Sequence, residues 1–248
     1  MHTYGLIGFP LTHSFSQRYF TEKFAREGIT DAQYELFELP DVATALPDLL
    51  SRPGLRGLNV TIPHKQAVQP YLDTLDASAR NVGAVNVIKI NPDGTRTGYN
   101  SDYYGFRQSL ERWLLELGRS TDSLRALVLG TGGASRAVTA TLRDLQLPYQ
   151  LVSRTRTADT VAYTDVPALL DQHELLINCS PVGTYPNTDA APDLPYTQLT
   201  DRHLLYDLVY NPAETRFMQL GRAQGAAALN GYEMLVLQAE KAWAIWQE

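Results

Sequence analysis

The amino-acid sequence predicts an α/β protein with two domains, each with a sheet covered by helices. Short runs rich in β-branched and aromatic residues alternate with amphipathic runs of helix length along nearly the whole chain, which is typical of βαβ units with parallel strands. A polar stretch at residues 119–123 separates two such series. The length of 248 residues allows one large domain or two small ones, since domains average about 150 residues.

The first series of elements begins near the N-terminus and alternates regularly. Its strands are expected at residues 3–8, 33–38, 55–61 and 84–90, and its helices at 14–28, 41–51 and 64–71. The sequence Asn91-Pro92-Asp93-Gly94 ends the series, because this combination of residues favours a turn.

A long amphipathic run and the polar stretch lead into the second series. A helix is expected at 102–117, beginning near Asp102 and ending at Gly118, because glycine commonly follows the last turn of a helix. We place a domain boundary beside this helix. The second series is expected to have strands at 125–129, 149–153, 174–178, 203–208 and 226–229, and helices at 133–146, 165–171 and 213–224.

Apolar residues at helical spacing mark the last segment, residues 231–248. They are Met234, Leu235, Ala239, Ala242, Trp243 and Trp246. A helix of this pattern buries one face, and because chain ends often lie close together, we expect it to pack on the first domain. The predicted domains are therefore 1–103 with 230–248, and 104–229.

Composition and charge exclude several classes of protein. With 44% apolar and 19% charged residues, the chain has the composition of a globular protein rather than of a disordered one. Its 27 acidic and 21 basic residues give a formal charge of -6, so it lacks the basic excess of a general nucleic-acid binder. We expect neither nucleic acid nor a metal among its ligands.

Cysteine content and hydropathy bear on the cellular compartment. The single cysteine, Cys179, cannot form an intramolecular disulfide or a multi-cysteine zinc site, and it favours a reducing compartment. The sequence has no basic segment followed by a long apolar run at its start, and no apolar stretch approaches the ~20 residues of a membrane span. We therefore expect a soluble cytoplasmic protein without a membrane partner.

The glycine-rich turn after the predicted strand at 125–129 is the first motif that carries chemistry. It reads Gly130-Thr131-Gly132-Gly133-Ala134-Ser135-Arg136 and precedes a helix-compatible run. In this setting Gly130 permits a tight turn, and Gly132 lets the backbone approach a pyrophosphate, which the N–H groups of the helix start would bind. Ser135 stands where many such loops have a third glycine. A purely structural turn is the alternative interpretation.

The end of the next predicted strand indicates which dinucleotide fits. It reads Ser153-Arg154-Thr155-Arg156, without the acidic residue that an NAD site usually has for the ribose hydroxyls. Arg154 and Arg156 instead offer guanidinium groups suited to a phosphate. Two arginines alone would suggest only a solvated loop, but together with the glycine-rich turn they favour NADP. The second domain is thus predicted to be Rossmann-like and to bind NADP.

Polar side chains cluster near predicted strand ends of the first part, where open α/β folds bind ligands. The segments are His13-Ser14-Phe15-Ser16, Asn59-Val60-Thr61-Ile62-Pro63-His64-Lys65, Gly83-Ala84-Val85-Asn86 and Tyr99-Asn100-Ser101-Asp102. Asn59 and Thr61 share one face of a strand, because side chains alternate with period two. Taken singly, Ser14 and Asp102 could be helix caps and Lys65 an exposed lysine.

A lysine and an aspartate that converge beside a nicotinamide would form a proton-transfer pair. The carboxylate orients the ammonium group, and the surroundings tune the lysine pKa. Lys65 and Asp102 are the candidates for this pair.

The ordered set of motifs resembles the shikimate dehydrogenases along the whole chain. Its outer members are Gly8-Phe9-Pro10-Leu11-Thr12-His13-Ser14-Phe15-Ser16 and Gly231-Tyr232-Glu233-Met234-Leu235-Val236-Leu237-Gln238-Ala239. Between them lie Asn59 to Lys65, Gly83 to Asn86, Asn100-Ser101-Asp102, Gly130 to Ala134, Ser153-Arg154-Thr155, Asn178-Cys179-Ser180-Pro181-Val182-Gly183 and Asp207-Leu208-Val209-Tyr210-Asn211-Pro212.

The resemblance implies a set of substrate-binding residues. Two hydroxyl donors at a helix start suit a carboxylate, and in this family pattern Ser14 and Ser16, with Tyr210 nearby, would bind the carboxylate of the substrate. Lys65 would be the main acid/base, in contact with Asp102. The residues that would hold the ring hydroxyls are Asn59, Thr61, Asn86, Asp102 and Gln238.

The resemblance also implies a set of NADP-binding residues. They are Gly130, Thr131, Gly132, Gly133, Ala134, Ser153, Arg154, Thr155, Asn178, Ser180, Gly183, Leu208 and Gly231. Three positions depart from the family pattern: Gln17 stands where proline is frequent, Ser153 where asparagine is frequent, and Thr184 where methionine is frequent. With Ser153 at this position, binding of the 2'-phosphate would depend on Arg154, with Arg156 as a second candidate.

The implied function is the reversible reduction of 3-dehydroshikimate to shikimate with NADPH, a step toward chorismate and the aromatic amino acids. A monomer or homodimer with an active-site cleft between an N-terminal substrate domain, completed by the C-terminal helix, and the NADP-binding domain is expected. Alternatives are a broader quinate/shikimate dehydrogenase that uses NAD or NADP, a non-catalytic shikimate/NADP-binding regulator, and a plain α/β interaction module.

Overall fold

The computed structural model describes residues 1–11 and 14–248, so Thr12 and His13 of the first motif lie outside the described residues. The chain divides into two compact units. The first comprises Met1–Tyr104 and Gln238–Glu248, and the second comprises Gly105–Leu237. These limits and the predicted domain limits differ at Tyr104, which belongs to the first unit, and in the segment 230–237, which belongs to the second unit.

The first unit is built on a mixed sheet with the strand order β2-β1-β3-β5-β6-β4. Its strands are β1 (His2–Gly8), β2 (Ala32–Glu38), β3 (Leu55–Val60), β4 (Thr74–Leu75), β5 (Val87–Ile90) and β6 (Arg96–Tyr99). Strand β1 pairs in parallel with β2 and β3, whereas β5 is antiparallel to both β3 and β6. The expectation of parallel strands is therefore wrong for this half of the sheet.

A hairpin explains the antiparallel half. The predicted turn Asn91-Pro92-Asp93-Gly94 leads directly from β5 into β6, a strand that the sequence did not predict. Gly94 has a positive φ of 86°, and its N–H donates to the Asn91 carbonyl over 2.9 Å. A short turn of this kind can join only antiparallel neighbours, because parallel strands need a long crossover.

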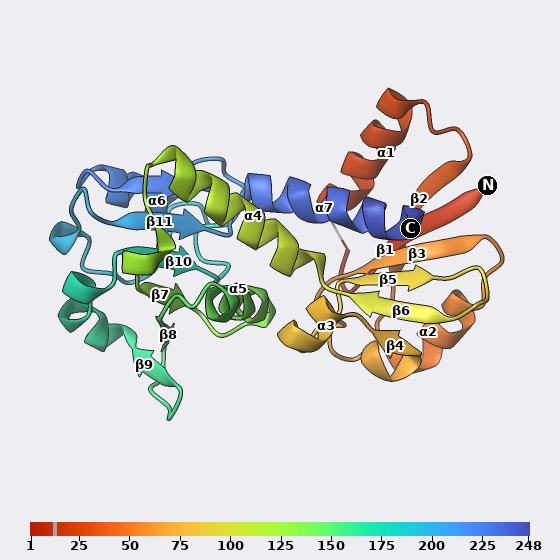
Figure 1. Cartoon of the computed structure of the whole chain (residues 1–248), viewed down its shortest axis with the longest axis horizontal. Helices are drawn as coiled ribbons and strands as arrows, with labels where there is room; N and C mark the ends of the chain where they lie inside the picture. Colours follow the sequence, from red (N-terminus) through yellow and green to blue (C-terminus); the bar gives the residue numbers. More distant parts are fainter. Residues whose placement is uncertain (12–13) are drawn as a thin grey trace. The chain divides into compact units, whose positions relative to one another are not determined.

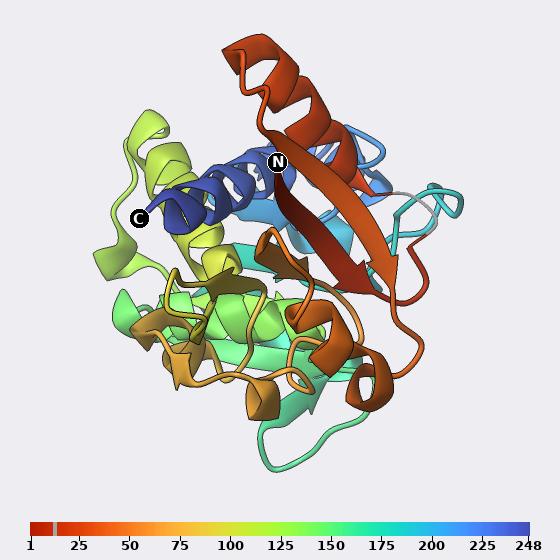
Figure 2. The same ribbon diagram turned by 90° about the vertical axis from the view of Figure 1, so that its right-hand side faces the viewer.

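Helices cover both faces of this sheet (Figures 1 and 2). On one face α1 (Phe15–Glu27) and the end of α7 (Tyr232–Gln247) form a core with β1, β2 and β5. On the other face α2 (Val42–Leu50) and α3 (Ala77–Val82) pack on β1, β3 and β5. Strand β1 thus contributes side chains to both cores, as the alternation of a strand predicts.

The predicted packing of the last helix on the first domain is confirmed by Trp246. Its Nε1 donates to the Ile88 carbonyl over 3.0 Å, and its ring lies 4.9 Å from that of Tyr4. A Cβ at Gly57 would overlap the Trp246 indole. The glycine in β3 therefore makes room for this side chain.

The predicted helix at 64–71 is wrong. Residues 62–68 form turns, and only a short 3₁₀ helix, η1 (Gln69–Tyr71), follows. Pro63 and Pro70 explain the difference, because proline lacks an N–H donor and disfavours helical geometry at the residue before it. Lys65 consequently lies in a turn rather than on a helix.

The second unit has a sheet in which every pairing is parallel, with the order β12-β11-β10-β7-β8-β9. Its strands are β7 (Ala126–Leu129), β8 (Tyr149–Ser153), β9 (Thr160–Ala162), β10 (Leu175–Asn178), β11 (Leu204–Asp207) and β12 (Ala227–Leu229). Helices α4 (Ser101–Glu116) and α5 (Gly133–Asp144) contribute to the core on one face. The other face is covered by α6 (Arg216–Arg222) and by the segment that contains Val166 and Leu170.

Short 3₁₀ helices replace one predicted helix of this unit. The helix expected at 165–171 is wrong: η3 (Tyr163–Ala168) and η4 (Leu170–Gln172) occupy this segment, and Pro167 inside η3 accounts for the tighter geometry. Further 3₁₀ turns are η2 (Thr121–Ser123) and η5 (Tyr196–Gln198). The predicted α/β class, with a Rossmann-like second half, is confirmed. Within residues 1–11 and 14–248, no helix combines the length and apolar character needed to cross a membrane.

Candidate active site

Lys65 and Asp102, predicted as a proton-transfer pair, are in direct contact. Lys65 Nζ lies 2.5 Å from Asp102 Oδ2, and the two side chains are 20% and 16% exposed. Asp102 belongs to the first turn of α4, and Lys65 follows β3, with its carbonyl accepting from the Val85 N–H over 2.7 Å. The lysine is therefore held at both its backbone and its ammonium group, while both side chains keep access to a small ligand.

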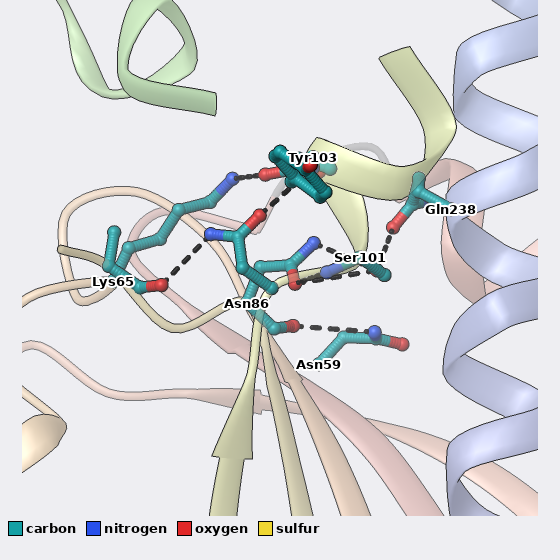
Figure 3. A network of polar contacts seen from close by, with 9 residues as sticks. Asn59, Lys65, Asn86, Ser101, Tyr103 and Gln238 are labelled. Atoms are coloured by element: carbon teal, nitrogen blue, oxygen red, sulfur yellow. Dashed lines mark hydrogen bonds and ion pairs between the residues drawn. The ribbon is translucent and has the colours of Figure 1, made fainter. Parts of the chain in front are cut away.

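A network of polar side chains lies beside Lys65 and extends to Gln238 of α7 (Figure 3). Asn86 Oδ1 accepts from the Ser101 N–H over 2.6 Å, and Asn86 Nδ2 donates to Ser101 Oγ over 3.1 Å. Ser101 Oγ in turn donates to Gln238 Oε1 over 3.4 Å. Three segments distant in sequence, at the start of β5, the start of α4 and in α7, are thereby joined. Asn86, Ser101 and Gln238 are all buried.

The side chain of Asn59 joins this network through the backbone carbonyl of Asn86. Its Nδ2 lies 3.5 Å from the Asn86 carbonyl, a long contact, and its Oδ1 accepts from the Tyr34 hydroxyl over 2.7 Å. Tyr34 is buried and also bonds with Ser16, and burial raises the pKa of Tyr34, which keeps the phenol neutral. Ser16, Tyr34 and Asn59 thus form a continuous chain of hydrogen bonds.

The other predicted substrate residues of this unit occupy the ends of elements. Ser14 is the N-cap of α1, and its Oγ accepts from the Gln17 N–H over 3.1 Å. Ser16 lies in the first turn of the same helix. Thr61 directly follows β3, where its N–H donates to the Ile7 carbonyl over 2.9 Å. The helix-cap interpretation of Ser14 is therefore correct, and it leaves both serines at the positive end of a helix dipole.

Three residues without a predicted role support the site. They are Tyr34, Asn100 and Ser101. Asn100 is buried, its Nδ2 donates to the Ala84 carbonyl over 2.9 Å, and its Oδ1 accepts from the Tyr103 N–H over 3.1 Å. Asn100 and Ser101 stand in a motif beside Asp102, which is a local signal. Tyr34 has no such signal, because its partners come from α1 and β3.

In the second unit the glycine-rich turn has the geometry expected of a phosphate-binding loop. Gly130 has a φ of 106°, a region that favours glycine, and Gly132 is the N-cap of α5 with no side chain to cap the helix. A Cβ added at Gly132 would meet no atom within 4 Å, so the space before the free N–H groups of α5 is open. These residues fit the pyrophosphate of a dinucleotide.

Ser135 keeps its place in this turn by a local bond. Its Oγ donates to the Gly132 carbonyl over 2.6 Å, and its side chain is buried. The hydroxyl thus stabilises the first turn of α5. It occupies the place of the third glycine without blocking the turn.

A cavity of about 890 Å³ extends from the glycine-rich turn. Its lining includes six predicted cofactor residues, namely Gly130, Thr131, Gly132, Ser153, Arg154 and Ser180. Arg154 is exposed, and its charge opposes the rise that partial burial causes in the pKa of the half-buried Tyr163. A cavity of this size, with a phosphate-binding turn and an arginine, suits a dinucleotide with a 2'-phosphate.

Arg156 is used differently from Arg154. One guanidinium nitrogen lies 2.5 Å from Asp165 Oδ1. Asp165 also accepts from the Ala162 N–H over 2.8 Å, and these two interactions, the backbone bond first, lower the pKa of its carboxyl. Arg156 therefore connects the segment after β8 to η3, and it does not belong to the cavity lining.

The remaining predicted cofactor residues do not belong to the cavity lining. They are Gly133, Ala134, Thr155, Asn178, Gly183, Leu208 and Gly231. Asn178 is fully buried behind Ser180, and its Oδ1 accepts from both the N–H and the Oγ of Ser180, over 3.0 and 2.6 Å. Gly183 has a φ of 90°.

Gly231 and Tyr210 follow the C-terminal end of β11. A Cβ at Gly231 would overlap the Leu208 carbonyl, and the Gly231 N–H donates to the Val209 carbonyl over 3.2 Å. Only glycine fits this approach of two backbone segments. Tyr210 is exposed, so its side chain can reach a ligand.

Metal chemistry has no visible ligand set in the described part of the chain. Among residues 1–11 and 14–248, no three His, Cys, Asp or Glu side chains come together as a metal site would require. Cys179 is buried, and desolvation raises the pKa of its thiol. A buried neutral thiol is a poor nucleophile.

Comparisons with known proteins cover nearly the whole chain. A family model described as the shikimate dehydrogenase substrate binding domain matches residues 6–88. A protein from Geobacillus kaustophilus named shikimate dehydrogenase (NADP(+)) is 37% identical over 259 residues, covering 98% of this chain and 91% of that protein.

Solved structures share the fold along the whole chain. Shikimate 5-dehydrogenase from Thermus thermophilus, in complex with NADP(H) and shikimate, matches with a TM-score of 0.83 at 31% identity and covers 99% of this chain and 93% of that one. Quinate dehydrogenase from Corynebacterium glutamicum, in complex with NAD, matches with a TM-score of 0.86 at 27% identity and the same coverage. The resemblance found in the sequence is confirmed, and the chain belongs to the shikimate dehydrogenase family.

Proposed function

We propose that this chain catalyses the reversible reduction of 3-dehydroshikimate to shikimate with NADPH as the reductant. The observation that carries the proposal is the contact of Lys65 with Asp102, within reach of buried amides that suit a polyhydroxylated ring. The curated relatives are NADP-dependent shikimate dehydrogenases. The cofactor and the type of reaction expected from the sequence agree with their names.

The residues of the first unit supply what a hydroxylated cyclic acid requires. Amide groups both donate and accept hydrogen bonds, as ring hydroxyls do. Asn59, Asn86 and Gln238 would bind these hydroxyls together with Thr61 and Asp102. Ser14 and Ser16 would bind the carboxylate at the start of α1, where the helix dipole favours a negative charge. Tyr210 is proposed as a further contact to the carboxylate.

Proton transfer is the step that this chain's own residues perform. Bound NADPH supplies the hydride, which adds to the ring carbonyl carbon. As the carbon–oxygen double bond becomes a single bond, the Lys65 ammonium would donate one proton to the carbonyl oxygen and give the hydroxyl of shikimate. In the reverse direction neutral Lys65 would accept this proton. Asp102 would hold the Nζ atom in place and stabilise its positive charge.

The cofactor would be held by the second unit. The N–H groups at the start of α5 would bind the pyrophosphate beside Gly130, Thr131 and Gly132, and Arg154 with Ser153 would bind the 2'-phosphate. Ser180 would contact the cofactor from the C-terminal end of the neighbouring strand β10. We also propose roles in cofactor binding for Gly133 and Ala134, whose N–H groups begin α5, and for Thr155, Asn178, Gly183, Leu208 and Gly231.

Assignments beyond the reaction follow from the same proposal. Residues 1–103 with 230–248 would be the substrate domain, and 104–229 the NADP-binding domain. The single cysteine fits a cytoplasmic, reducing compartment. The active form would be a monomer or a homodimer.

Four absorbance assays test the proposed function. Purified protein is mixed with shikimate or quinate, each with NADP or NAD, and formation of the reduced nicotinamide is followed. We expect fast reduction only with shikimate and NADP. Comparable rates with quinate or NAD would instead identify a broader quinate/shikimate dehydrogenase, in line with the similarity to a quinate dehydrogenase. No turnover despite ligand binding, measured by calorimetry, would identify a regulator.

A further inference from the structure

The carboxylate of Asp207 is a buried ionisable group that the proposed reaction does not use. It lies at the C-terminal end of β11 and is 0% exposed. Three donors converge on it: Asn178 Nδ2 over 2.9 Å and the Val209 N–H over 3.0 Å at Oδ1, and Thr215 Oγ1 over 2.6 Å at Oδ2. A buried carboxylate is costly unless hydrogen bonds of this kind satisfy it.

The contacts of Asp207 lead to the wall of the cofactor cavity. Asn178 donates to Asp207 through Nδ2 and accepts through Oδ1 from the N–H and the hydroxyl of Ser180. Ser180 lines the cavity, and its backbone N lies 3.3 Å from where a Cβ of Gly130 would be. The order Asp207, Asn178, Ser180 therefore runs from the core to the glycine-rich turn.

The same carboxylate also fixes the segment after β11. Its bond to the Val209 N–H sets the turn that leads to Tyr210, and Thr215 is the N-cap of α6. One side chain thus ties the chain after β10 to the chain after β11. Asn178 Nδ2 has two acceptors, Asp207 Oδ1 over 2.9 Å and the Val182 carbonyl over 3.3 Å, and the carboxylate is the nearer and the charged one. Asp207 is thus the main acceptor that turns the nitrogen of Asn178 toward β11 and its oxygen toward Ser180.

We propose that Asp207 is a positioning residue for NADP, which acts through Asn178 to fix Ser180 at the wall of the cofactor cavity. This inference rests on the proposed function, since it assigns that cavity to NADP. Asp207 itself does not touch the cofactor. Its loss leaves Asn178 Nδ2 with only the longer bond to the Val182 carbonyl, over 3.3 Å, so that Asn178, and Ser180 through it, are held less firmly.

Direct binding of NADP to the purified protein, measured by calorimetry, tests the proposal without relying on turnover. Asp207→Ala removes the nearer acceptor of Asn178 and leaves the buried Thr215 hydroxyl and Val209 N–H without theirs, and it should weaken NADP binding about tenfold. Asp207→Asn keeps an oxygen toward Asn178 and Val209, and its NH₂ can donate to the Thr215 hydroxyl. This conservative variant should bind NADP within about threefold of the wild type.

Tyr206→Phe is the matched control for a general loss of stability. Tyr206 precedes Asp207 on β11, is fully buried, and donates to Ser109 Oγ over 2.9 Å on the opposite face of the strand. The variant Tyr206→Phe should lower the stability of the protein without changing its affinity for NADP. The KM for shikimate should stay unchanged in Asp207→Asn and Tyr206→Phe, because both variants keep an oxygen at position 207 that accepts from the Val209 N–H before Tyr210.

The outcomes separate the two proposals. If the wild-type protein does not bind NADP, the proposed function fails. If the wild type binds NADP and Asp207→Ala binds it equally well, the positioning role is wrong although the proposed function stands. Equal losses of affinity in Asp207→Ala and Tyr206→Phe would also overturn the positioning role, because they would reduce it to a general effect of stability.

Discussion

The ammonium nitrogen of Lys65 lies 2.5 Å from Oδ2 of Asp102, and both side chains remain partly accessible. This contact joins a turn after β3 to the first turn of α4, two segments 37 residues apart. A lysine with one fixed partner and remaining donors can hold its proton toward a ligand. The contact is the basis for the first two predictions.

Replacing Lys65 by alanine should remove the proton donor and lower kcat by about 10²- to 10⁴-fold, the usual contribution of general acid–base catalysis. The KM for shikimate should change little in comparison. Steady-state kinetics with shikimate and NADP measure both values. Lys241→Ala is the control, since Lys241 belongs to the same unit but lies over the Tyr104 ring. Near wild-type turnover of Lys65→Ala would show that another group transfers the proton.

Asp102→Asn should lower kcat by about tenfold, because the amide can still accept a hydrogen bond but no longer stabilises the positive charge. In the double variant with Lys65→Ala the two effects should not add, since the residues act as a pair. A double-mutant cycle on kcat measures this coupling. Full additivity of the two losses would contradict a joint role.

The two arginines after β8 should differ in their effect on NADP. Arg154→Ala should raise the KM for NADP at least about tenfold and leave the KM for NAD unchanged, because a charged hydrogen bond to the 2'-phosphate is lost. Arg156→Ala should stay within about threefold of the wild type, since its guanidinium binds Asp165. Initial rates with both cofactors test this prediction. Equal effects of the two variants on NADP would refute the assignment of Arg154.

Tyr34→Phe should raise the KM for shikimate several-fold and lower the free energy of unfolding by about 1 kcal/mol, because Asn59 loses its hydrogen-bond donor. Tyr4→Phe is the control: its hydroxyl accepts from Gln247 Nε2 over 3.2 Å in the same aromatic core, away from Asn59. Kinetics and urea unfolding of both variants are compared. An unchanged KM in Tyr34→Phe would rule out positioning of Asn59 by Tyr34.

The carboxyl of Asp207 should make the folded protein less stable as the pH rises through the weakly acidic range. Burial, opposed by the bonds from Thr215, Val209 and Asn178, raises its pKa to about 6. In the unfolded chain the carboxyl loses its proton near its ordinary pKa of about 3.9. Between these values the folded protein binds more protons, so this group lowers the free energy of unfolding as the pH rises from about 4 to about 6, by up to about 3 kcal/mol.

The variant Asp207→Asn isolates this contribution. Its neighbours Cys179 and Tyr196 stay neutral in this range, because burial raises the pKa of each. Relative to the variant, the wild type should therefore lose stability between about pH 4 and about pH 7, as measured by urea unfolding. A constant difference between the two proteins over this range would show that the carboxyl of Asp207 does not titrate there.

Local signals explain what the sequence can predict. The glycine-rich turn is recognisable because Gly130 and Gly132 follow a buried strand directly, and the structure gives them a positive φ and a free helix start, respectively. The same reasoning fails at 64–71, where amphipathic spacing suggests a helix although Pro70 interrupts it. In the hairpin from β5 to β6 the turn is predictable but the second strand is not, because β6 is only four residues long.

Contacts between distant segments cannot be predicted from spacing. The hydrogen bond from Tyr34 to Asn59 joins two strands whose side chains give no separate sign of a partner. Likewise, nothing in Ser153-Arg154-Thr155-Arg156 shows that Arg156 binds Asp165 while Arg154 lines the cavity. The burial of Asn178 behind Ser180 depends on Asp207 from the next strand of the sheet. Each of these contacts joins residues that only the tertiary fold brings together.

Transfer of deuterium tests the central claim most directly. Shikimate that carries deuterium on the carbon bearing the oxidised hydroxyl is incubated with the protein and NADP, and the reduced cofactor is analysed by mass spectrometry. Hydride transfer from shikimate to the nicotinamide predicts deuterated NADPH, formed by the wild type and nearly absent with Lys65→Ala. Unlabelled NADPH, or no NADPH from a wild-type protein that binds both ligands, would contradict the account.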